Sequence, residues 1–287
     1  MKILIVSGSR ADVGLLHCPE AALRKAGFEC DFRLMWENDF ATQFSQADEL
    51  MSATHPDLLL VLGDRFEILA TATAAHLQRI PIAHIAGGDV SEGSYDDAMR
   101  DCVSRMATLH FTTSSAATAR LVARGYSNVH LVGNPAVDYI MHENWRRPER
   151  EVEGDYVLVG YYPETIDGTS EWDKVIRAIA GRKAIVVTPN LDRGAGALHL
   201  QMVMDARIHT NLHLWGSQSH DGFLNLLLHC QEFIGNSSSI FYEAPWMRPG
   251  GVPCILIGKR QRGRAIPWGG EGRASERIAD ALKRWNP

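Results

Sequence analysis

The sequence predicts an α/β protein with two doubly wound parallel sheets, one in each half of the chain. Two observations support this fold class. Short apolar, β-branched runs alternate with helical segments along both halves, as strands and helices do in parallel sheets. The alternation is interrupted at residues 144–155 (NWRRPEREVEGD), where charged residues, Pro and Gly are typical of a linker. We therefore expect a first domain at residues 1–147 and a second domain at residues 148–287.

In the first half, a strand is expected at Lys2–Ser7 (KILIVS). A continuous apolar run that leads into a glycine turn and then a helix opens a doubly wound sheet. The same pattern then recurs along the half. It predicts further strands at residues 57–62, 80–85, 109–113 and 129–132, and helices at residues 12–25, 65–78, 96–108 and 115–124.

The alternation restarts after the linker. It predicts strands at residues 156–160, 183–188, 212–214, 232–234 and 253–257, and helices at residues 170–180, 223–230, 239–246 and 275–285. Two Rossmann-like halves in tandem resemble the GT-B architecture, which holds a nucleotide-sugar in a cleft between its domains. We therefore expect a ligand cleft between the two domains.

The composition excludes several classes of protein. The chain of 287 residues is 45% hydrophobic, so it can bury a sizeable core. A net charge of −5 argues against a chain that coats nucleic acid through bulk charge, although a local basic groove stays an alternative. The five cysteines form no CxxC pair, and scattered free cysteines are typical of a reducing cytosol. We found no signal-peptide pattern and no apolar run of the ~20 residues that a membrane span needs. We therefore expect a soluble, cytoplasmic protein.

Two turns that follow strands carry candidate ligand-binding residues. Gly8 lets backbone amides approach an anion at the start of a helix that contains Asp12, and Arg10 adds a charged fork suited to phosphate. Asp64 lies at the carboxyl end of a strand, where open α/β sheets bind ligands, and it can orient a hydroxyl or accept a proton. The alternatives are an ordinary strand-to-helix turn and a helix N-cap at Asp64.

An acidic loop at residues 87–97 (GGDVSEGSYDD) gives two further candidates, Asp89 and Asp96. Clustered carboxylates raise one another's pKa, as a general acid or base requires. The alternative is a solvated loop in which Asp96 caps the next helix.

The second half holds two candidate nucleotide-binding segments. The run at residues 235–239 (GNSSS) precedes a short helix with Glu243, and amides and hydroxyls at a helix start suit a pyrophosphate. The basic loop at residues 258–264 (GKRQRGR) can close over a diphosphate. The alternatives are serines that only cap the helix, and a basic loop that faces solvent or a nucleic-acid backbone.

Seven segments in order along the chain resemble the motifs of the hydrolysing UDP-N-acetylglucosamine 2-epimerases, especially their sialic-acid branch. The segments are GSRADVG at 8–14, GDRFE at 63–67, GGDVSEGSYDDAMR at 87–100, YPET at 162–165, PNLDRG at 189–194, GNSSSI at 235–240 and GKRQRGR at 258–264. The resemblance implies a GT-B-like fold and recognition of UDP. It also implies anti elimination of UDP from the sugar, followed by water addition to give N-acetylmannosamine.

By position, the resemblance assigns acid–base roles to Asp64 and Asp96. It implies no metal and no cofactor, and relatives are often dimers, so a homodimer is expected. The residues expected to bind the UDP-sugar are Gly8, Arg10, Asp12, Tyr162, Asn190, Asn236, Ser237, Ser238, Ser239, Glu243, Arg260 and Arg264.

The chain departs from the family pattern on the sugar side. Ala86 replaces a catalytic glutamate, Tyr162 replaces the histidine of HPET, and Asp101 replaces a further histidine. Asp89 lies three residues after Ala86 and is the candidate to supply the missing carboxylate. We expect C2 epimerisation to be slow or absent while UDP-sugar binding survives.

Two alternative functions follow from these departures. The first is a glycosyltransferase that moves a sugar from its UDP carrier to an acceptor. Arg260, Arg262 and Trp268 would line its acceptor channel, which would suit an acidic acceptor such as nucleic acid. The second is a catalytically inactive protein that binds UDP-sugars.

Overall fold

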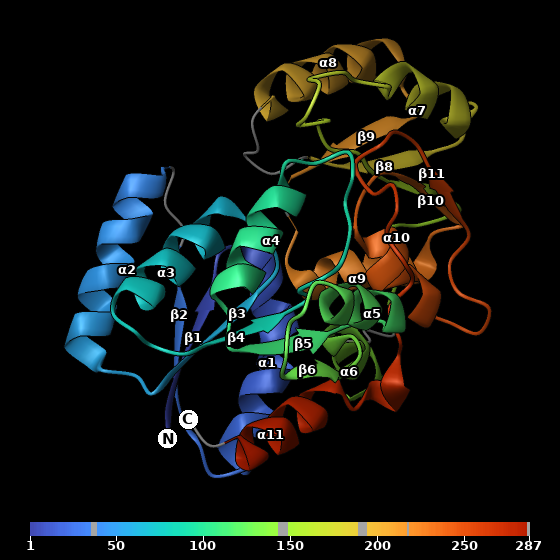
Figure 1. The fold of residues 1–287 in the computed structure, drawn as a ribbon. Coiled ribbons are helices and arrows are strands. Elements are labelled where there is room, and N and C mark those ends of the chain that lie inside the picture. Colours follow the sequence, from blue (N-terminus) through green and yellow to red (C-terminus); the bar gives the residue numbers. More distant parts are fainter. Residues whose placement is uncertain (36–38, 143–148, 189–193, 217, 286–287) are drawn as a thin grey trace. The chain divides into compact units, whose positions relative to one another are not determined.

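The chain forms two compact units, each described here by itself. The computed structural model describes residues 1–35, 39–142, 149–188, 194–216 and 218–285, and of Arg10 and Ala11 the backbone only. The first unit comprises Met1–Val90, Asp96–His142 and Ala265–Pro287, and the second comprises Ser91–Tyr95 and Glu143–Arg264. Both units are α/β, as the sequence predicts (Figure 1).

The sheet of the first unit has six parallel strands in the order β2-β1-β3-β4-β5-β6. Its strands are β1 (Lys2–Ser7), β2 (Glu29–Leu34), β3 (Leu58–Leu62), β4 (Ile82–Ile85), β5 (Leu109–Thr112) and β6 (Val129–Leu131). Its helices are α1 (Arg10–Lys25), α2 (Phe40–Thr54), α3 (Phe66–Leu77), α4 (Asp96–Met106), α5 (Ser115–Ala123), α6 (Pro135–His142) and α11 (Ala274–Arg284).

Helices cover both faces of this sheet, which is why its strands are apolar throughout. Side chains alternate between faces along a strand. Ile3 and Ile5 therefore pack in the core that contains residues of α1 and α11, whereas Leu4 and Val6 pack in the core that contains residues of α2, α3 and α4. A strand that is buried on both faces reads as a continuous hydrophobic run, as Lys2–Ser7 does.

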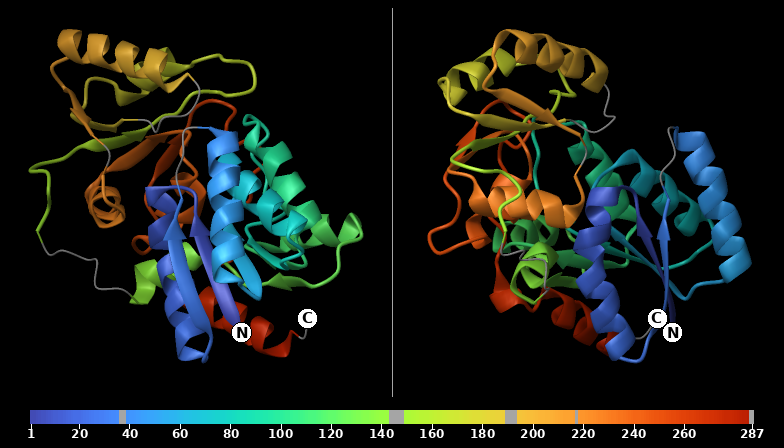
Figure 2. Two further views of the ribbon diagram at one scale, coloured as in Figure 1. Left: turned by 90° about the vertical axis from the view of Figure 1, so that its left-hand side faces the viewer. Right: turned by 180° about the vertical axis from the view of Figure 1, so that it is seen from behind.

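The C-terminal helix is placed differently from the predicted domain boundary, which assigns it to the second domain. Helix α11 buries one apolar face, including Ile278 and Leu282, in the same core as Leu16 and Leu23 of α1. Both views of Figure 2 show α11 (red) beside α1 (blue). Segment 265–287 belongs to the first unit because this amphipathic face completes a core whose other residues lie much earlier in the sequence.

The sheet of the second unit has five parallel strands in the order β11-β10-β7-β8-β9. Val157 and Val159 face the core with α7 and α8, and Phe233 packs its ring on Phe223 of α9. The strands are β7 (Val157–Gly160), β8 (Ala184–Val187), β9 (Leu212–Trp215), β10 (Glu232–Gly235) and β11 (Cys254–Leu256). The helices are α7 (Trp172–Ile179), α8 (Ala195–Ile208), α9 (His220–His229) and the short α10 (Ser239–Tyr242), with 3₁₀ turns η1 (Ala244–Trp246) and η2 (Gly270–Gly272), the latter in the first unit.

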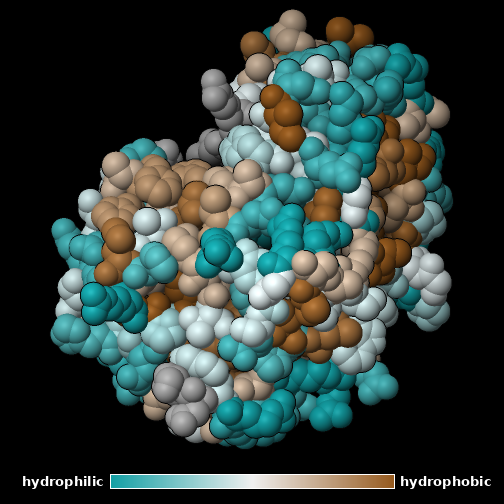
Figure 3. All heavy atoms as spheres, in the orientation of Figure 1, coloured by the Kyte–Doolittle hydropathy of each residue, from teal (hydrophilic) through white to brown (hydrophobic). Residues whose placement is uncertain are grey.

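The surface carries both hydrophilic and hydrophobic residues, which are intermixed on the face drawn in Figure 3. Some large apolar side chains are exposed, and Leu200, Met204 and Ile208 follow one another at four-residue spacing on one face of α8. Within the described ranges, no helix is long and apolar enough to cross a membrane.

Candidate functional site

In the first unit, the candidate residues lie at a switch point of the sheet. The chain runs from β1 outward to β2 and then returns past β1 to β3, so the loops after β1 and β3 diverge at adjacent strand ends. Open α/β sheets bind ligands at such a point. Gly8–Asp12 and Gly63–Asp64 are the residues that follow these two strands.

A buried guanidinium gathers the carboxylates at this edge. Arg100 of α4 is 1% exposed, and it donates hydrogen bonds to the carboxylates of Asp64 and Asp97. It also donates to the backbone oxygen of Asp89 over 2.7 Å. A buried charge is costly unless it is paired and hydrogen-bonded. Arg100 therefore ties the turn after β3 to the first turn of α4.

The other two predicted carboxylates lie in the same part of the chain. The carboxylate of Asp89 accepts from the hydroxyl of Thr113, with oxygen–oxygen distances of 2.8 and 3.0 Å. Asp89 is therefore held at the end of β5. Asp96 is half-buried and is the first residue of α4, one turn before Arg100.

A histidine holds the turn that carries Asp64. His84 of β4 is fully buried, and burial lowers its pKa to about 4, so the ring is neutral at pH 7. Its Nε2 lies 2.8 Å from the oxygen of Gly63, and its Nδ1 lies 3.0 Å from Oγ of Ser104. A carbonyl only accepts, so Nε2 carries the proton and Nδ1 accepts from Ser104.

The turn after β4 has an unusual backbone conformation at Ala86, the position at which the family resemblance implies a catalytic glutamate. Ala86 adopts φ 65°, which non-glycine residues rarely do, and Gly88 follows at φ 80°. A side chain at Gly88 would meet the backbone oxygen of Ala117 at 2.7 Å, so only glycine fits. Ala86 is 8% exposed and has no group that can exchange a proton.

The loops after β7 and β10 meet at the switch point of the second sheet, where the two strands are neighbours. The side-chain amide of the fully buried Asn236 accepts from the N–H of Tyr162 at 2.7 Å and donates to its oxygen at 2.9 Å. Gly235 adopts φ 143°, and a side chain there would meet the oxygen of Gly160 at 2.1 Å. These constraints fix the Gly-Asn-Ser segment directly beside Tyr162.

Glu243 is a buried carboxylate at the end of α10. Burial raises its pKa to about 7, while a hydrogen bond from Ser239 and the charge of Arg264 act in the opposite direction. Its Oε2 is buried and has no hydrogen-bond partner among the described residues. Arg264 donates to the hydroxyl of Tyr242 and lies 5.0 Å from the centre of its ring. Oε2 of Glu243 is thus suited to accept from a ligand hydroxyl.

The serines predicted to cradle phosphate follow the fixed Asn236. Ser237 is 6% exposed, and its Oγ accepts from the N–H of Ser239 at 3.3 Å. Ser238 and Ser239 are half-buried at the start of α10.

The basic loop at residues 258–264 is bound to the loop that follows β7. The backbone N–H of Lys259 donates to Oε1 of Glu164 at 2.7 Å, and its ammonium pairs with Asp167 at 2.9 Å. Arg260 donates to the oxygen of Pro163 at 2.9 Å, and its guanidinium carbon lies 5.7 Å from the centre of the Tyr162 ring. Tyr162, which replaces the family's histidine, thus forms an aromatic platform for Arg260.

Two predicted binding residues are not described. Asn190 lies outside the described residues, and so does the side chain of Arg10. At the neighbouring positions, Ser9 caps α1 and donates to the carboxylate of Asp12 at 2.7 Å. A side chain at Gly8 would press on Ile68 at 3.2 Å, so the turn after β1 packs closely on α3.

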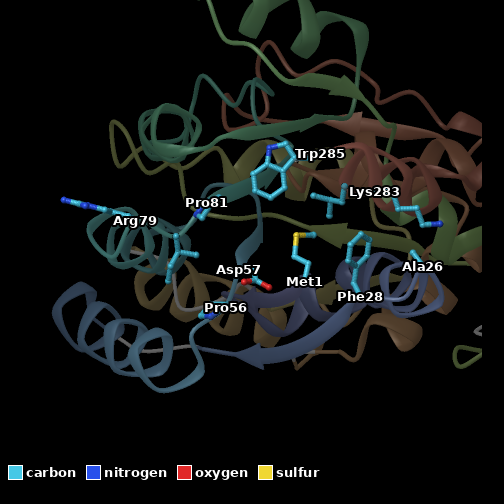
Figure 4. Close-up of a pocket in the computed structure, with 11 residues that line it drawn as sticks. Met1, Ala26, Phe28, Pro56, Asp57, Arg79, Pro81, Lys283 and Trp285 are labelled. Atoms are coloured by element: carbon cyan, nitrogen blue, oxygen red, sulfur yellow. The ribbon is translucent and has the colours of Figure 1, made fainter. Parts of the chain in front are cut away.

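The first unit also has a hollow of about 680 Å³ away from these residues (Figure 4). Met1, Phe28 and Trp285 border it, together with Asp57. Residues 1, 28 and 57 precede β1, β2 and β3, so the hollow lies at the amino ends of the strands. Ligands of this fold class bind at the carboxyl ends, so the hollow is not the candidate site.

Known proteins share both the sequence pattern and the fold. The family described as UDP-N-acetylglucosamine 2-epimerase matches residues 37–269. A hydrolysing GDP/UDP-N,N'-diacetylbacillosamine 2-epimerase of Campylobacter jejuni is 27% identical over 238 residues, which are 77% of this chain and 61% of the relative. A UDP-N-acetylglucosamine 2-epimerase of Neisseria meningitidis is 29% identical over 229 residues, 75% of this chain and 59% of the relative. The chain thus spans about three-fifths of the length of these relatives.

A solved structure supports the fold. The crystal structure of UDP-GlcNAc 2-epimerase from Methanocaldococcus jannaschii, in complex with UDP-GlcNAc and UDP, superposes with a TM-score of 0.81 at 18% identity. The match covers 99% of this chain and 100% of the other. At that identity the likeness concerns the fold.

The two parallel-sheet units, each with its candidate residues at a switch point, define a protein with two Rossmann-like, GT-B-like domains. Within that class the chain belongs to the UDP-N-acetylglucosamine 2-epimerase family, whose pattern covers residues 37–269.

The structure adds three residues that our sequence analysis did not single out: Arg100, Thr113 and Glu164. The signal for Arg100 was present, because an arginine three residues after Asp97 on a helix can pair with it. Glu164 stands in the YPET segment, but its backbone partner Lys259 is 95 residues away. Thr113 follows β5, and no local pattern connects it with Asp89.

Proposed function

We propose that this protein processes a UDP-sugar at its anomeric carbon, as the hydrolysing 2-epimerases of its family do. Family membership supports this proposal, together with one observation in the second unit. Glu243 is buried with Oε2 lacking a partner among the described residues, close to the side chains of Ser239 and Arg264. Such a carboxylate is stabilised by hydroxyl donors, and the ribose of a nucleotide carries two.

The nucleotide would be held by the second unit. Ser237, Ser238 and Ser239 would donate to phosphate oxygens, and Arg264 would add a fixed positive charge. The ribose hydroxyls would donate to Glu243. Several hydrogen bonds to charged groups, each worth about 1.5–3 kcal/mol, are sufficient to carry nucleotide affinity.

The carboxylates of the first unit would act on the sugar. Elimination breaks the bond between C1 and the UDP oxygen and removes the proton from C2, and water addition then completes the reaction. Asp64 and Asp96 are the candidates for these proton transfers. The positive charge of Arg100 beside Asp64 fixes the orientation of that carboxylate.

A second function, hydrolysis or transfer without epimerisation, is favoured by the turn after β4. Ala86 cannot exchange a proton at C2, and the carboxylate of Asp89 accepts from Thr113. Cleavage at C1 with attack by water or an acceptor hydroxyl needs no proton removal from C2. An acceptor and a homodimer are further proposals, to be tested in solution.

One experiment separates these functions. The protein is incubated with several UDP-sugars, with and without added acceptors, while UDP release and the sugar product are followed. Release of UDP with N-acetylmannosamine supports the epimerase reaction, and release with an unchanged sugar supports hydrolysis. A glycoside formed only with acceptor supports the transferase. Failure to bind or cleave any UDP-sugar contradicts the proposal.

A further inference from the structure

A five-residue segment of the acidic loop belongs to the second unit. Ser91–Tyr95, which we name the strap, leaves the first unit after Val90 and returns to it at Asp96. Its two ends are hydrogen-bonded to different loops. The N–H of Glu92 donates to the oxygen of Arg262 at 3.1 Å. The N–H of Tyr95 donates to Oγ1 of Thr165 at 3.2 Å.

The middle of the strap lies directly against the basic loop. A side chain at Gly93 would lie 2.2 Å from the backbone carbon and oxygen of Lys259, a distance that no real contact allows. The obstacle is backbone and cannot rotate away. Glycine at 93 is therefore required for this approach.

The loop that receives the strap is itself fixed. Thr165 follows Glu164, which accepts from the N–H of Lys259, and precedes Asp167, which pairs with the ammonium of Lys259. Oγ1 of Thr165 lies 3.1 Å from Oγ of Ser94 in addition to its bond from Tyr95. One hydroxyl thus engages the last two residues of the strap. Asp96, the first residue of α4, comes next in the chain.

We propose that Thr165 is a positioning residue for Asp96. The hydroxyl of Thr165 holds Ser94 and Tyr95, so the backbone that leads into Asp96 has one conformation instead of many. The inference rests on the proposed function, in which Asp96 exchanges protons with the sugar. A catalytic group that is displaced by about 1 Å can lose on the order of 100-fold in rate. Thr165 acts on the reaction only through Asp96.

The test uses substitutions that remove the hydroxyl of Thr165 or fill the space between Gly93 and Lys259. Thr165→Val removes both bonds to the strap and keeps the shape of the side chain, whereas Thr165→Ser keeps the hydroxyl. Gly93→Ala displaces the strap from Lys259. Gly196→Ala, in α8, is the matched control, because a side chain there meets nothing within 4 Å.

Three quantities are measured on the full chain: amide hydrogen exchange over residues 91–97, UDP affinity by calorimetry, and kcat and KM for UDP release from a UDP-sugar. In Thr165→Val and Gly93→Ala we expect exchange of the Tyr95 amide to rise about tenfold or more, and kcat to fall about 10- to 100-fold. In Thr165→Val, KM and UDP affinity should stay within about threefold, because this substitution leaves the basic loop at residues 258–264 unchanged. Thr165→Ser and Gly196→Ala should match the parent protein.

The outcomes separate the two proposals. Faster exchange in Thr165→Val with an unchanged kcat would overturn the positioning role and leave the proposed function standing. Unchanged exchange would overturn the inference that Thr165 orders the strap. A parent protein that turns over no UDP-sugar would overturn the proposed function, and with it the role of Asp96, whatever the exchange shows.

Discussion

The guanidinium of Arg100 donates to the carboxylate of Asp64, although one residue lies on α4 and the other in the turn after β3. The side chain of Arg100 is 2% exposed and that of Asp64 is 21% exposed, so a buried guanidinium holds a carboxylate that solvent can still reach. The same guanidinium also reaches Asp97. This one side chain thus sets where two carboxylates point.

Replacing Arg100 should therefore destabilise the fold. Arg100→Ala leaves carboxylates without their partner, and breaking a buried pair in this way costs about 3–5 kcal/mol. Urea denaturation at pH 7 measures the loss in the free energy of unfolding. The control is Arg124→Ala, which removes an ion pair with Asp101 whose side chains are 45% and 47% exposed. Exposed pairs contribute about 0–1 kcal/mol. Equal losses in the two variants would contradict the structural role of Arg100.

Two buried histidines should make the fold sensitive to acid. Burial lowers the pKa values of His84 and His110 from 6.5 to about 4 in the folded state. Between those pH values the unfolded chain binds more protons, so each histidine contributes stability above pH 6.5 that is lost as the pH falls towards 4. The loss amounts to about 3 kcal/mol for each. Glu243 acts oppositely, because its pKa is raised from 4.5 to about 7, so the test compares variants.

His110→Phe isolates one of these contributions. The phenyl ring can keep the contact with Tyr126, whose ring centre lies 5.0 Å from that of His110. We expect the decline of the unfolding free energy between pH 7 and pH 4 to shrink by about 3 kcal/mol. His199→Phe, at an exposed position, controls for the added ring. An identical decline in His110→Phe and the parent would refute this explanation.

Nucleotide affinity should depend on the protonation of Glu243. Its pKa of about 7 in the free protein means that the carboxyl is half protonated at neutral pH. Hydrogen bonds to the ionised form are the stronger ones, so UDP affinity should rise several-fold from pH 6 to pH 8. The terminal phosphate of UDP titrates near pH 6 as well, as phosphate groups do.

The comparison with Glu243→Gln separates these titrations. This variant keeps the shape and loses the protein's titration, so calorimetry should find lower affinity at pH 8 and a smaller dependence on pH than in the parent. Ser237→Ala should lower affinity at every pH and keep the parent's pH dependence. If Glu243→Gln follows the parent curve, Glu243 does not contact the nucleotide.

The chemistry at C2 should be slow or absent in the parent protein. Ala86 has no proton to exchange, and Tyr162 replaces a histidine whose ordinary pKa is near neutral. In deuterated water, NMR should find little deuterium at C2 of the sugar while UDP binding persists. Restoring Ala86→Glu together with Tyr162→His should raise incorporation, since acid–base groups typically contribute about 10²–10⁴-fold. Rapid incorporation of deuterium at C2 by the parent protein would contradict this prediction and indicate an ordinary epimerase.

Local pattern predicted most of the fold because most strands are continuous apolar runs beside glycine turns. The prediction is confirmed for β1 to its last residue, and most other predicted elements differ by a few residues at their ends. It missed β2, α2, α6 and α8. In β2 (ECDFRL) only Cys30 is buried, so the strand has no apolar run to reveal it. Helix α8 carries exposed Leu200 and Met204 beside buried Leu198 and Met202, so its apolar residues do not follow a single helical face.

The candidate site was predictable where function depends on residue type within a motif. Asp64, Asn236 and Glu243 all lie at strand ends or in the segment that follows, as the motifs indicate. The sequence does not show which side chains form hydrogen bonds with one another in the fold. Arg100 pairs with Asp64, which is 36 residues away in the sequence, and Tyr95 pairs with Thr165, which is 70 residues away. Such pairs are set by tertiary packing and leave no local period.

The position of α11 has a consequence for the order in which the protein can fold during synthesis. Helix α11, which is made after the second unit, closes the core around Leu16 and Leu23 of α1. Until it emerges, α1 presents an uncovered apolar flank to water, and exposed flanks of this kind favour aggregation. The first unit therefore cannot complete its core until the whole second unit has been translated, and a chaperone could cover the exposed face of α1 during that time. A fragment cut at residue 147 would keep that flank bare, so expressing the first domain alone should yield insoluble material.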